Sequence, residues 1–314
     1  MRAVVTGGSG FIGGYLVKLL LQESHSVIVL SRSSDIQKHA TLYQLQKEFG
    51  DEQLKLCSWN PSEVTEDLIS ILDGCDAVFH LAGTSIFDKR WTNSFMKQLV
   101  DSRIISSNVL VDAISQCNNK PSVLIGASGV SYYGESGDKE LDETMESGND
   151  FLAKLSVDWE DAVSKAQKFG VRTCSARIGI VLGRGGGALD NILPLFSWHI
   201  GGHVGNGGQY FPWIHVEDCV RAFLFAATNN NIKGPFNNVS PNPVTMGDFC
   251  KKLGVQMNRW SWAHAPYLAV RIMLGAVADV IVCSLRVVPK VLENEGFTFK
   301  YNTVEDALKD IVEN

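Results

Sequence analysis

Apolar runs separated by longer amphipathic stretches make up most of the chain. The runs have the length of buried strands, and they fall at residues 3–5, 27–30, 54–59, 76–83, 121–128, 172–177 and 235–239. Helices are predicted at residues 35–50, 90–117, 150–168, 189–200 and 214–228, with an amphipathic closing helix at 304–312. Strands that alternate with helices in this way predict an α/β fold with a doubly wound parallel sheet.

The first predicted strand is followed at once by a glycine-rich turn. Gly7, Gly10 and Gly13 stand between this strand and a helix whose apolar residues recur at i, i+3 and i+4. This spacing lets the turn fold tightly and brings backbone N–H groups at the start of the helix close to a pyrophosphate. The turn therefore predicts a dinucleotide-binding site, because the strand before it and the helix after it are both present.

The end of the second predicted strand indicates which dinucleotide is bound. A site specific for NAD carries an Asp or Glu here, which accepts a hydrogen bond from the ribose 2′-hydroxyl. In this chain the strand ends in Ser31 and Arg32, and the nearest acid, Asp35, comes several residues later. A guanidinium pairs with phosphate and stacks on adenine, so the strand end favours the 2′-phosphate of NADP(H). A solvated loop arginine is the alternative interpretation.

Composition narrows the class of protein. The 314 residues are 45% hydrophobic and 20% charged, which is enough for a large core in one domain or two. The net charge is −6 and no run of Lys or Arg occurs, which argues against binding to nucleic acid. The seven cysteines form no CxxC pair, which fits free thiols in a reducing compartment better than disulfides or zinc.

The chain shows no signal peptide ahead of the first strand, so the sequence predicts a cytoplasmic protein, with an organelle as the alternative. The stretch 267–283 is apolar, but Arg271 and Asp279 interrupt it. We therefore expect a buried or interface helix there rather than a membrane span, and a membrane-surface role stays open. The expected partner is a small-molecule substrate, and a homodimer stays open.

Several motifs resemble those of a known family. TGGSGFIG in the glycine turn, HLAG after the fourth strand, GNGGQYFPWIHVED and FNNVS resemble the extended short-chain dehydrogenase/reductases, the family of sugar-nucleotide epimerases and dehydratases. More narrowly, DKRW, SYYGE, RIGIVLGRGGGAL and PKVLENEGFTFKY resemble an atypical branch, often labelled epimerase-family or cell-division-inhibitor-like, whose substrates are poorly defined. The resemblance covers nearly the whole chain.

The resemblance implies a Rossmann-type domain with a smaller C-terminal cap domain. The Rossmann domain is expected at 1–185, with 214–240 returning to it, the cap at 186–213 and 241–303, and the closing helix at 304–314. The resemblance also implies that NADP(H) lies across the glycine turn, the ends of the second and fourth strands and the long helix. The residues expected to contact it are Gly7, Ser9, Gly10, Phe11, Ile12, Gly13, Ser31, Arg32, Leu81, Ala82, Gly83, Gln98, Arg103 and Val181.

The catalytic residues of the family are missing at their usual spacing. Its members use a Ser or Thr together with a YxxxK pair on one helix, in which the lysine lowers the pKa of the tyrosine for proton exchange with the substrate. The predicted helix 150–168 contains no tyrosine, and Gly129 stands where the catalytic hydroxyl is expected. We expect Tyr132 or Tyr133 to polarise the substrate oxygen, with Ser128 as a second donor; packing in the pocket wall is the alternative for both tyrosines.

A second departure from the family concerns the substrate. The family's GxGxQxRxFIHV loop supplies an arginine to the substrate diphosphate, and Phe211 stands at that position here. An aromatic side chain forms no ion pair with a diphosphate, so this loop predicts an apolar or flat substrate face. Arg184, Arg221 and Arg259 are the cations that could compensate.

The remaining candidate groups have a structural and a functional interpretation. Lys154 is either catalytic or a solvated lysine paired with an acid one turn earlier. His215 and Asp218 are expected to begin a helix rather than to bind a metal, and His80 is expected on the floor of the pocket. The glycines at 185–187 resemble a mobile loop over the cofactor.

These observations support three hypotheses for the function. The leading one is an NADP(H)-dependent oxidoreductase that transfers hydride to or from a small carbonyl or alcohol substrate. The second is a protein that binds NADP(H) as a structural or sensing ligand and has lost its catalytic residues. The third is a sugar-nucleotide epimerase, which must account for the missing YxxxK pair and for Phe211.

Overall fold

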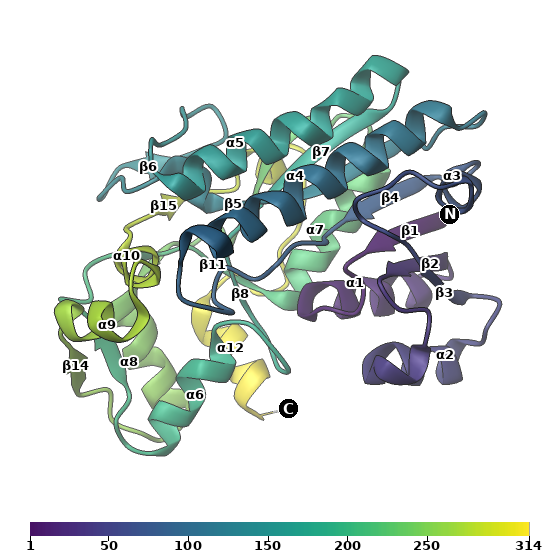
Figure 1. Cartoon of the computed structure of the whole chain (residues 1–314). Helices are drawn as coiled ribbons and strands as arrows, with labels where there is room; N and C mark the ends of the chain where they lie inside the picture. The colour runs from purple at the N-terminus through teal and green to yellow at the C-terminus, as the bar shows by residue number, and fades with distance from the viewer. Residues whose placement is uncertain (314) are drawn as a thin grey trace.

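Seven parallel strands form the central sheet of the computed structural model, which describes residues 1–313 (Figure 1). Their order is β3-β2-β1-β4-β5-β7-β12, so the chain builds outward from β1 in one direction and from β4 in the other. The strands are β1 (Arg2–Thr6), β2 (Ser26–Ser31), β3 (Leu54–Ser58), β4 (Ala77–His80), β5 (Val123–Gly129), β7 (Arg172–Ile178) and β12 (Gly234–Asn238). This arrangement confirms the predicted doubly wound α/β fold, with its switch point between β1 and β4.

Helices cover both faces of the sheet (Figure 1). One face is covered by α1 (Phe11–Gln22), α2 (Ala40–Phe49) and α7 (Val216–Thr228), and the other by α3 (Glu66–Leu72), α4 (Asn93–Gln116) and α5 (Phe151–Ser164). Successive strand residues point to opposite faces, so Val5 lies in the first hydrophobic core and Val4 in the second. Because both faces are buried, the central strands β1, β4 and β5 are mostly apolar rather than alternating.

Local capping explains where the predicted helices differ from the observed ones. The helix predicted at 35–50 is divided into η1 (Ile36–Lys38) and α2, because the Asp35 side chain accepts a hydrogen bond from the Gln37 N–H and starts a separate turn. The helix predicted at 150–168 is α5 followed by η3 (Lys165–Phe169), and η2 (Val130–Tyr133) follows β5. Helix α3 was not predicted, since its seven residues are too short to show a clear period.

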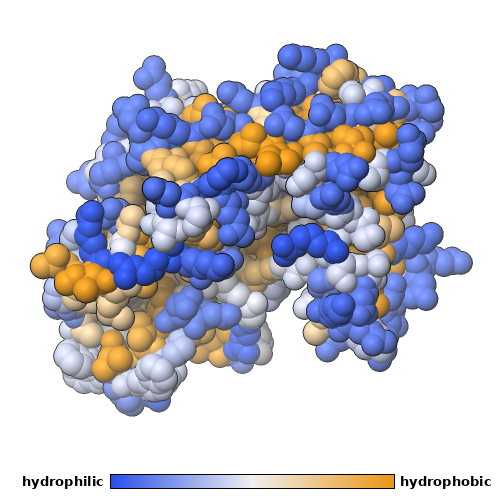
Figure 2. All heavy atoms as spheres, in the orientation of Figure 1, coloured by the Kyte–Doolittle hydropathy of each residue, from blue (hydrophilic) through white to orange (hydrophobic). Residues whose placement is uncertain are grey.

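The last third of the chain supplies most of a second packed region. Its helices are α6 (Leu189–Ser197), α8 (Met246–Gln256), α9 (Tyr267–Leu274), α10 (Val277–Val282), α11 (Lys290–Asn294) and α12 (Val304–Glu313). Its strand pairs are β8 (Ile180–Leu182) with β11 (Trp213–His215), β10 (Tyr210–Phe211) with β13 (Val244–Thr245), β9 (Gly202–Val204) with β14 (Ala263–Ala265), and β6 (Glu140–Leu141) with β15 (Arg286–Val287). A separate hydrophobic cluster joins α6, α8 and α12. Figure 2 shows the surface hollowed between this region and the part that carries α1 and α2.

The apolar stretch 267–283 folds as two short helices, α9 and α10. The chain breaks between them at Gly275, whose φ of 68° is left-handed. Helix α9 buries none of its residues and exposes Leu268, Ile272 and Met273, whereas Val277 of α10 is buried. The expected buried helix is therefore found only for α10. No helix within residues 1–313 is long and apolar enough to cross a membrane.

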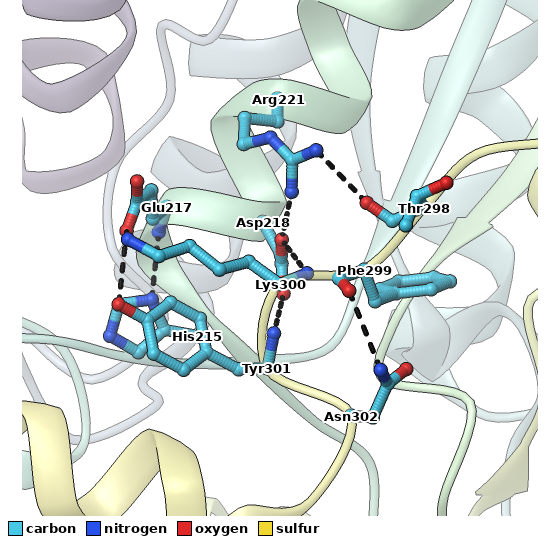
Figure 3. A network of polar contacts seen from close by, with 9 residues as sticks. All are labelled: His215, Glu217, Asp218, Arg221, Thr298, Phe299, Lys300, Tyr301 and Asn302. Atoms are coloured by element: carbon cyan, nitrogen blue, oxygen red, sulfur yellow. Dashed lines mark hydrogen bonds and ion pairs between the residues drawn. The ribbon is translucent and has the colours of Figure 1, made fainter.

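The carboxylate of Asp218 fastens the C-terminal segment to α7 (Figure 3). Its side chain is 1% exposed and accepts hydrogen bonds from the backbone N–H of Lys300 at 2.9 Å and of Tyr301 at 2.8 Å. Arg221, one turn along α7, completes the set with an ion pair of 2.6 Å and also donates to the Thr298 carbonyl. A buried carboxylate is stable only when its acceptors are used in this way.

The turn between β1 and α1 leaves no room for side chains. A Cβ atom on Gly13 would lie 2.1 Å from the Gly7 carbonyl oxygen, and one on Gly7 would lie 2.8 Å from the Leu81 carbonyl carbon. Gly14, the next residue of α1, has more space, since its Cβ would lie 3.4 Å from a methyl group of Thr41. Close packing at Gly7 and Gly13 therefore brings the ends of β1 and β4 and the start of α1 to one point.

Gly13→Ala should lower the free energy of unfolding by roughly 1–3 kcal/mol, because the added methyl group must displace backbone atoms. Gly14→Ala is the matched control and should be neutral or stabilise by up to about 1 kcal/mol, since alanine favours a helix over glycine. Urea denaturation followed by circular dichroism measures both. Equal effects of the two substitutions would contradict the packing described here.

Asp218→Asn should destabilise the protein by about 3 kcal/mol, because an amide cannot accept the three donors that the buried carboxylate accepts. The exposed loop residue Asp138 provides the control, and Asp138→Asn should change stability by less than about 0.5 kcal/mol. Both are measured by urea denaturation. A neutral Asp218→Asn variant would show that the C-terminal segment is held by its apolar contacts alone.

Candidate functional site

The start of α1 has backbone N–H groups that can bind an anion. Gly10 precedes the helix without a side-chain cap, and no acidic residue occurs in the first turn. The first backbone N–H groups of a helix have no acceptor within the helix, and they carry the positive end of its dipole. These groups lie at the carboxyl end of β1, beside the switch point of the sheet. This is the place where doubly wound folds bind a dinucleotide pyrophosphate.

The end of β2 presents a free guanidinium. Arg32 is exposed and forms no hydrogen bond or ion pair with any other residue in the range 1–313. The nearest acid, Asp35, is already used, since it caps η1 and pairs with Lys38 at 3.6 Å. The Ser31 hydroxyl lies 3.3 Å from Nε2 of His39, so a second polar group stands beside the arginine. The arrangement fits a phosphate better than a ribose hydroxyl.

The end of β4 lies against a second guanidinium that lacks a carboxylate. Leu81 and Ala82 are half-buried, and the Arg103 side chain lies beside Gly83, 3.5 Å from the position of a Cβ there. The Arg103 guanidinium stacks 4.9 Å from the Trp159 ring, and its one hydrogen bond within residues 1–313 goes to the Leu99 carbonyl. Burial lowers the pKa of Arg103 to about 10, so it stays charged at neutral pH. Arg103 is thus a partly buried cation without a counter-charge among residues 1–313, where an anion would be favourable.

His80 lies beneath this edge of the sheet and is fully buried. Its Nδ1 is 2.7 Å from the Thr6 hydroxyl, and its Nε2 is 3.1 Å from that of Ser107 and 3.2 Å from that of Ser106. Burial, and then the charge of Arg103, lower the pKa of His80 to about 3. The imidazole is therefore neutral and orients the Thr6 hydroxyl, which accepts the Ala82 N–H. His80 supports the site rather than exchanging protons in it.

Gln98, Val181 and Phe11 are also predicted to contact the cofactor, and they lie in different surroundings. Gln98 is exposed on α4, and Val181 is buried in β8, which pairs with β11 beside the switch point. The ring of Phe11 is surrounded by glycines, since Cβ atoms on Gly183, Gly186 or Gly187 would lie 2.6–3.0 Å from it. The glycines at 185–187, which were expected to form a mobile loop over the cofactor, thus pack on the first residue of α1 in this structure.

Two of the three predicted catalytic hydroxyls belong to one buried network. The Ser128 hydroxyl donates to Glu160 at 2.8 Å, and the Tyr133 hydroxyl donates to Asn237 at 2.7 Å while accepting from Arg177 at 3.0 Å. Glu160 and Arg177 form a bidentate pair with both distances at 2.9 Å. Burial opposes the charge of Arg177, but the hydrogen bond and charge of Glu160 outweigh it and raise the pKa above its usual value. Burial raises the pKa of Tyr133 to about 12.

Tyr132 differs from its neighbour. Its ring is half-buried under the guanidinium of Arg177, 3.4 Å from Cζ, and packs edge-on against Tyr133. Its hydroxyl forms no hydrogen bond with any residue in the described part of the chain. Tyr132 therefore keeps a free donor at the carboxyl end of β5, while Ser128 and Tyr133 do not.

Helix α5 contains no tyrosine and presents apolar groups towards α4. Leu152 and Leu155 are buried in a cluster with Phe95 and Leu99 of α4. Lys154 is exposed, and Asp150 caps the helix by accepting the Ala153 N–H instead of pairing with that lysine. The predicted ion pair between Lys154 and Asp150 is thus absent from the residues that the structure covers.

The expectation that Phe211 lines a substrate face is wrong. Its ring is 4% exposed and packs on Phe249, 4.5 Å between ring centres, within the cluster of α6, α8 and α12. Side chains alternate along β10, so Tyr210 is the residue of this pair that remains half-exposed. Of the suggested compensating cations, Arg184 donates to carbonyls of α12, and Arg221 pairs with Asp218.

His215 starts α7, as predicted: its Nδ1 accepts the Glu217 N–H, and its ring stacks on Tyr301 (Figure 3). Its Nε2 lies 3.4 Å from Asp310. Burial lowers the pKa of His215, against the opposing effect of Asp310. No group of three potential metal ligands occurs within residues 1–313.

Sequence reasoning missed Glu160, Arg177 and Asn237, which hold the network below Tyr132. Arg177 of β7 pairs in register with Ser128 of β5 on one side and with Asn237 of β12 on the other. Ser128, Arg177 and Asn237 therefore stand in one row across the sheet. Strand order and register create this row. The one signal in the sequence is the charged residue Arg177 near the end of a predicted strand.

Two family models match this chain. Residues 3–239 match the NAD dependent epimerase/dehydratase family, and residues 265–311 match a domain of unknown function, DUF1731. The Arabidopsis thaliana "Epimerase family protein SDR39U1 homolog, chloroplastic" is 38% identical over 315 residues, which are 100% of this chain and 87% of that protein. The Mus musculus "Epimerase family protein SDR39U1" is 33% identical and covers 99% of this chain and 100% of its own.

Solved structures agree with these matches. The human epimerase family protein SDR39U1 (isoform 2), crystallised with NADPH, has a TM-score of 0.87 and 30% identity over 100% of both chains. UDP-glucuronic acid 4-epimerase from Bacillus cereus, in complex with UDP-glucuronic acid and NAD, has a TM-score of 0.79 over 100% of this chain and 98% of its own. At 18% identity that likeness shows the fold alone. The chain therefore belongs to the NAD dependent epimerase/dehydratase family, within its branch of epimerase family proteins.

Proposed function

We propose that the protein binds NADP(H) and acts as an oxidoreductase on a small carbonyl or alcohol substrate. The observation that carries the proposal is the pair of guanidinium groups on either side of the uncapped α1, Arg32 and Arg103, neither of which has a carboxylate partner within residues 1–313. The related human protein crystallised with NADPH supports the same cofactor. Bound NADPH supplies a hydride to a carbonyl carbon.

Different residues of the crevice bind different parts of NADP(H) and of the substrate. The backbone N–H groups at the start of α1 hold the pyrophosphate, and Arg32 with Ser31 holds the 2′-phosphate. Arg103 supplies a second positive charge beside Gly83. Tyr132 donates a proton to the substrate oxygen as the carbonyl is reduced, because its hydroxyl is the predicted donor that no neighbour occupies.

A second candidate is a protein that binds NADP(H) and senses it without turnover. The structure favours this candidate at one point, since Ser128 and Tyr133 donate within the buried network of Glu160, Arg177 and Asn237. Sugar-nucleotide epimerisation is a third and weaker candidate, because α5 lacks the tyrosine and Phe211 is buried. A cytoplasmic location and a homodimer stay predictions.

Wild-type protein should bind NADPH at least tenfold more tightly than NADH, and Arg32→Ala should abolish this preference. The expected loss for NADPH is about 1.5–3 kcal/mol, the usual contribution of a hydrogen bond to a charged group. Fluorescence titration with both nucleotides measures it. Arg259→Ala, which removes a cation beside the C-terminal end of α8, is the control and should change neither affinity. Equal binding of NADPH and NADH by the wild type would contradict the role of Arg32.

Tyr132→Phe should lower kcat by about 100-fold with a panel of aldehydes and ketones, since it removes the proton donor. NADPH affinity should not change. Tyr133→Phe is the matched control: it should cost about 1–2 kcal/mol of stability, because Asn237 and Arg177 lose a buried partner, and it should leave kcat within a few-fold of the wild type. If the wild type binds NADPH but reduces no member of the panel, the sensing candidate replaces the oxidoreductase.

A further inference from the structure

The loop between β4 and α4 is held in place by hydrogen bonds and by aromatic packing. Its Thr84 N–H donates to the Ser102 hydroxyl at 3.1 Å, and the Trp91 indole N–H donates to the Ile86 carbonyl at 2.9 Å. Trp91 also packs edge-on against Phe151, 5.6 Å between ring centres. Ile86 and Trp91 therefore anchor the loop in the apolar cluster of α4 and α5.

The loop carries Arg90 to the corner between α9 and α10. A Cβ on Gly275 would lie 3.3 Å from Nε and 3.4 Å from Nη2 of Arg90, so the guanidinium lies directly over this glycine. Arg90 is exposed, and its guanidinium forms no hydrogen bond or ion pair with any residue from 1 to 313. Lys89 is likewise exposed and unpaired there, and the adjacent Asp88 forms no ion pair with either cation.

Arginines elsewhere around this region are neutralised. Arg271 pairs with Asp279 at 3.0 Å, and Arg286 pairs with Glu140 at 3.3 Å. Arg90 thus keeps the full recognition capacity of a guanidinium, with a fork of donors that matches a carboxylate or a phosphate.

Arg90 and Tyr132 border the same part of the molecule. Val280 of α10 packs in the cluster that contains Trp91, and Cys283, which follows α10, packs in the cluster that contains Tyr132. Figure 1 shows the N-terminal end of α4 beside α10, in agreement with these contacts. The loop also begins at the cofactor crevice, because Leu81 lies against Gly7. Helix α10 and the residue that follows it therefore pack both against the loop that carries Arg90 and against the cluster that contains Tyr132.

We infer that Arg90 anchors the substrate through an anionic group, so that the substrate is a small carbonyl compound or alcohol bearing a carboxylate or a phosphate. The inference rests on the proposed function for the reaction, but the anion site stands independently of turnover. The anion pairs with the guanidinium over Gly275, and the carbonyl end of the molecule reaches towards Tyr132. Arg90 then selects the substrate without contacting the reacting carbon.

Binding to protein loaded with NADP⁺ tests this, because no reduction follows. The probes are 4-carboxybenzaldehyde, 4-formylphenyl phosphate and neutral benzaldehyde, each titrated by calorimetry. Wild-type protein should bind at least one anionic probe tenfold or more tightly than benzaldehyde, and the pair of anionic probes distinguishes a carboxylate from a phosphate. Arg90→Gln should reduce the anionic probes to the affinity of benzaldehyde, and Arg90→Lys should retain part of the difference. Lys89→Gln removes the same charge from the same loop and should have little effect.

The outcomes separate the two proposals. Equal affinity of the wild type for all three probes, or an unchanged preference in Arg90→Gln, would overturn the anion anchor. Loss of the preference in Lys89→Gln to the same extent would overturn it too, since general charge would then explain the binding. If Arg90-dependent binding is found but NADPH reduces neither anionic aldehyde nor benzaldehyde, the anchor stands and the oxidoreductase proposal fails.

Discussion

Close backbone contact at the glycine turn is the constraint on which the rest of the structure depends. With a Cβ on Gly13 only 2.1 Å from Gly7, and one on Gly7 only 2.8 Å from Leu81, no other residue type fits either position without movement. The contact fixes the start of α1 at the switch point of the sheet, where β1 and β4 part. The uncapped helix end, Arg103 and the β4–α4 loop are therefore held around one crevice.

Three carboxylates attach the C-terminal region to this framework. Asp218 accepts the N–H groups of Lys300 and Tyr301, Glu143 accepts that of Val291 at 3.2 Å, and Glu135 accepts that of Ser284 at 2.7 Å. In each case an acid from the epimerase part holds backbone of the region that matches DUF1731. Because a backbone donor does not depend on side-chain identity, such contacts allow that region to change its side chains while keeping its place.

The polar groups below Tyr132 hold two of the three predicted catalytic hydroxyls in one buried network. Glu160 and Arg177 satisfy one another and also bind the hydroxyls of Ser128 and Tyr133. A buried charge pair is costly unless all its partners are present, so these hydroxyls serve the network first. Leu152 and Leu155 of α5 reinforce the effect by filling the space between α4 and α5 with apolar surface. Tyr132 remains the free donor above the network.

The sequence by itself determined the sheet, most helices and the dinucleotide turn, because apolar periodicity and the glycine spacing are local properties of the chain. It also placed Arg32 at the end of β2, since that position follows from the strand boundary alone. Only the tertiary structure decided that Tyr133 is buried while Tyr132 is free, that Phe211 packs inside the C-terminal cluster, and that Arg90 lies over Gly275. These outcomes depend on register between strands and on contacts between segments far apart in the chain, which no local pattern of residues encodes.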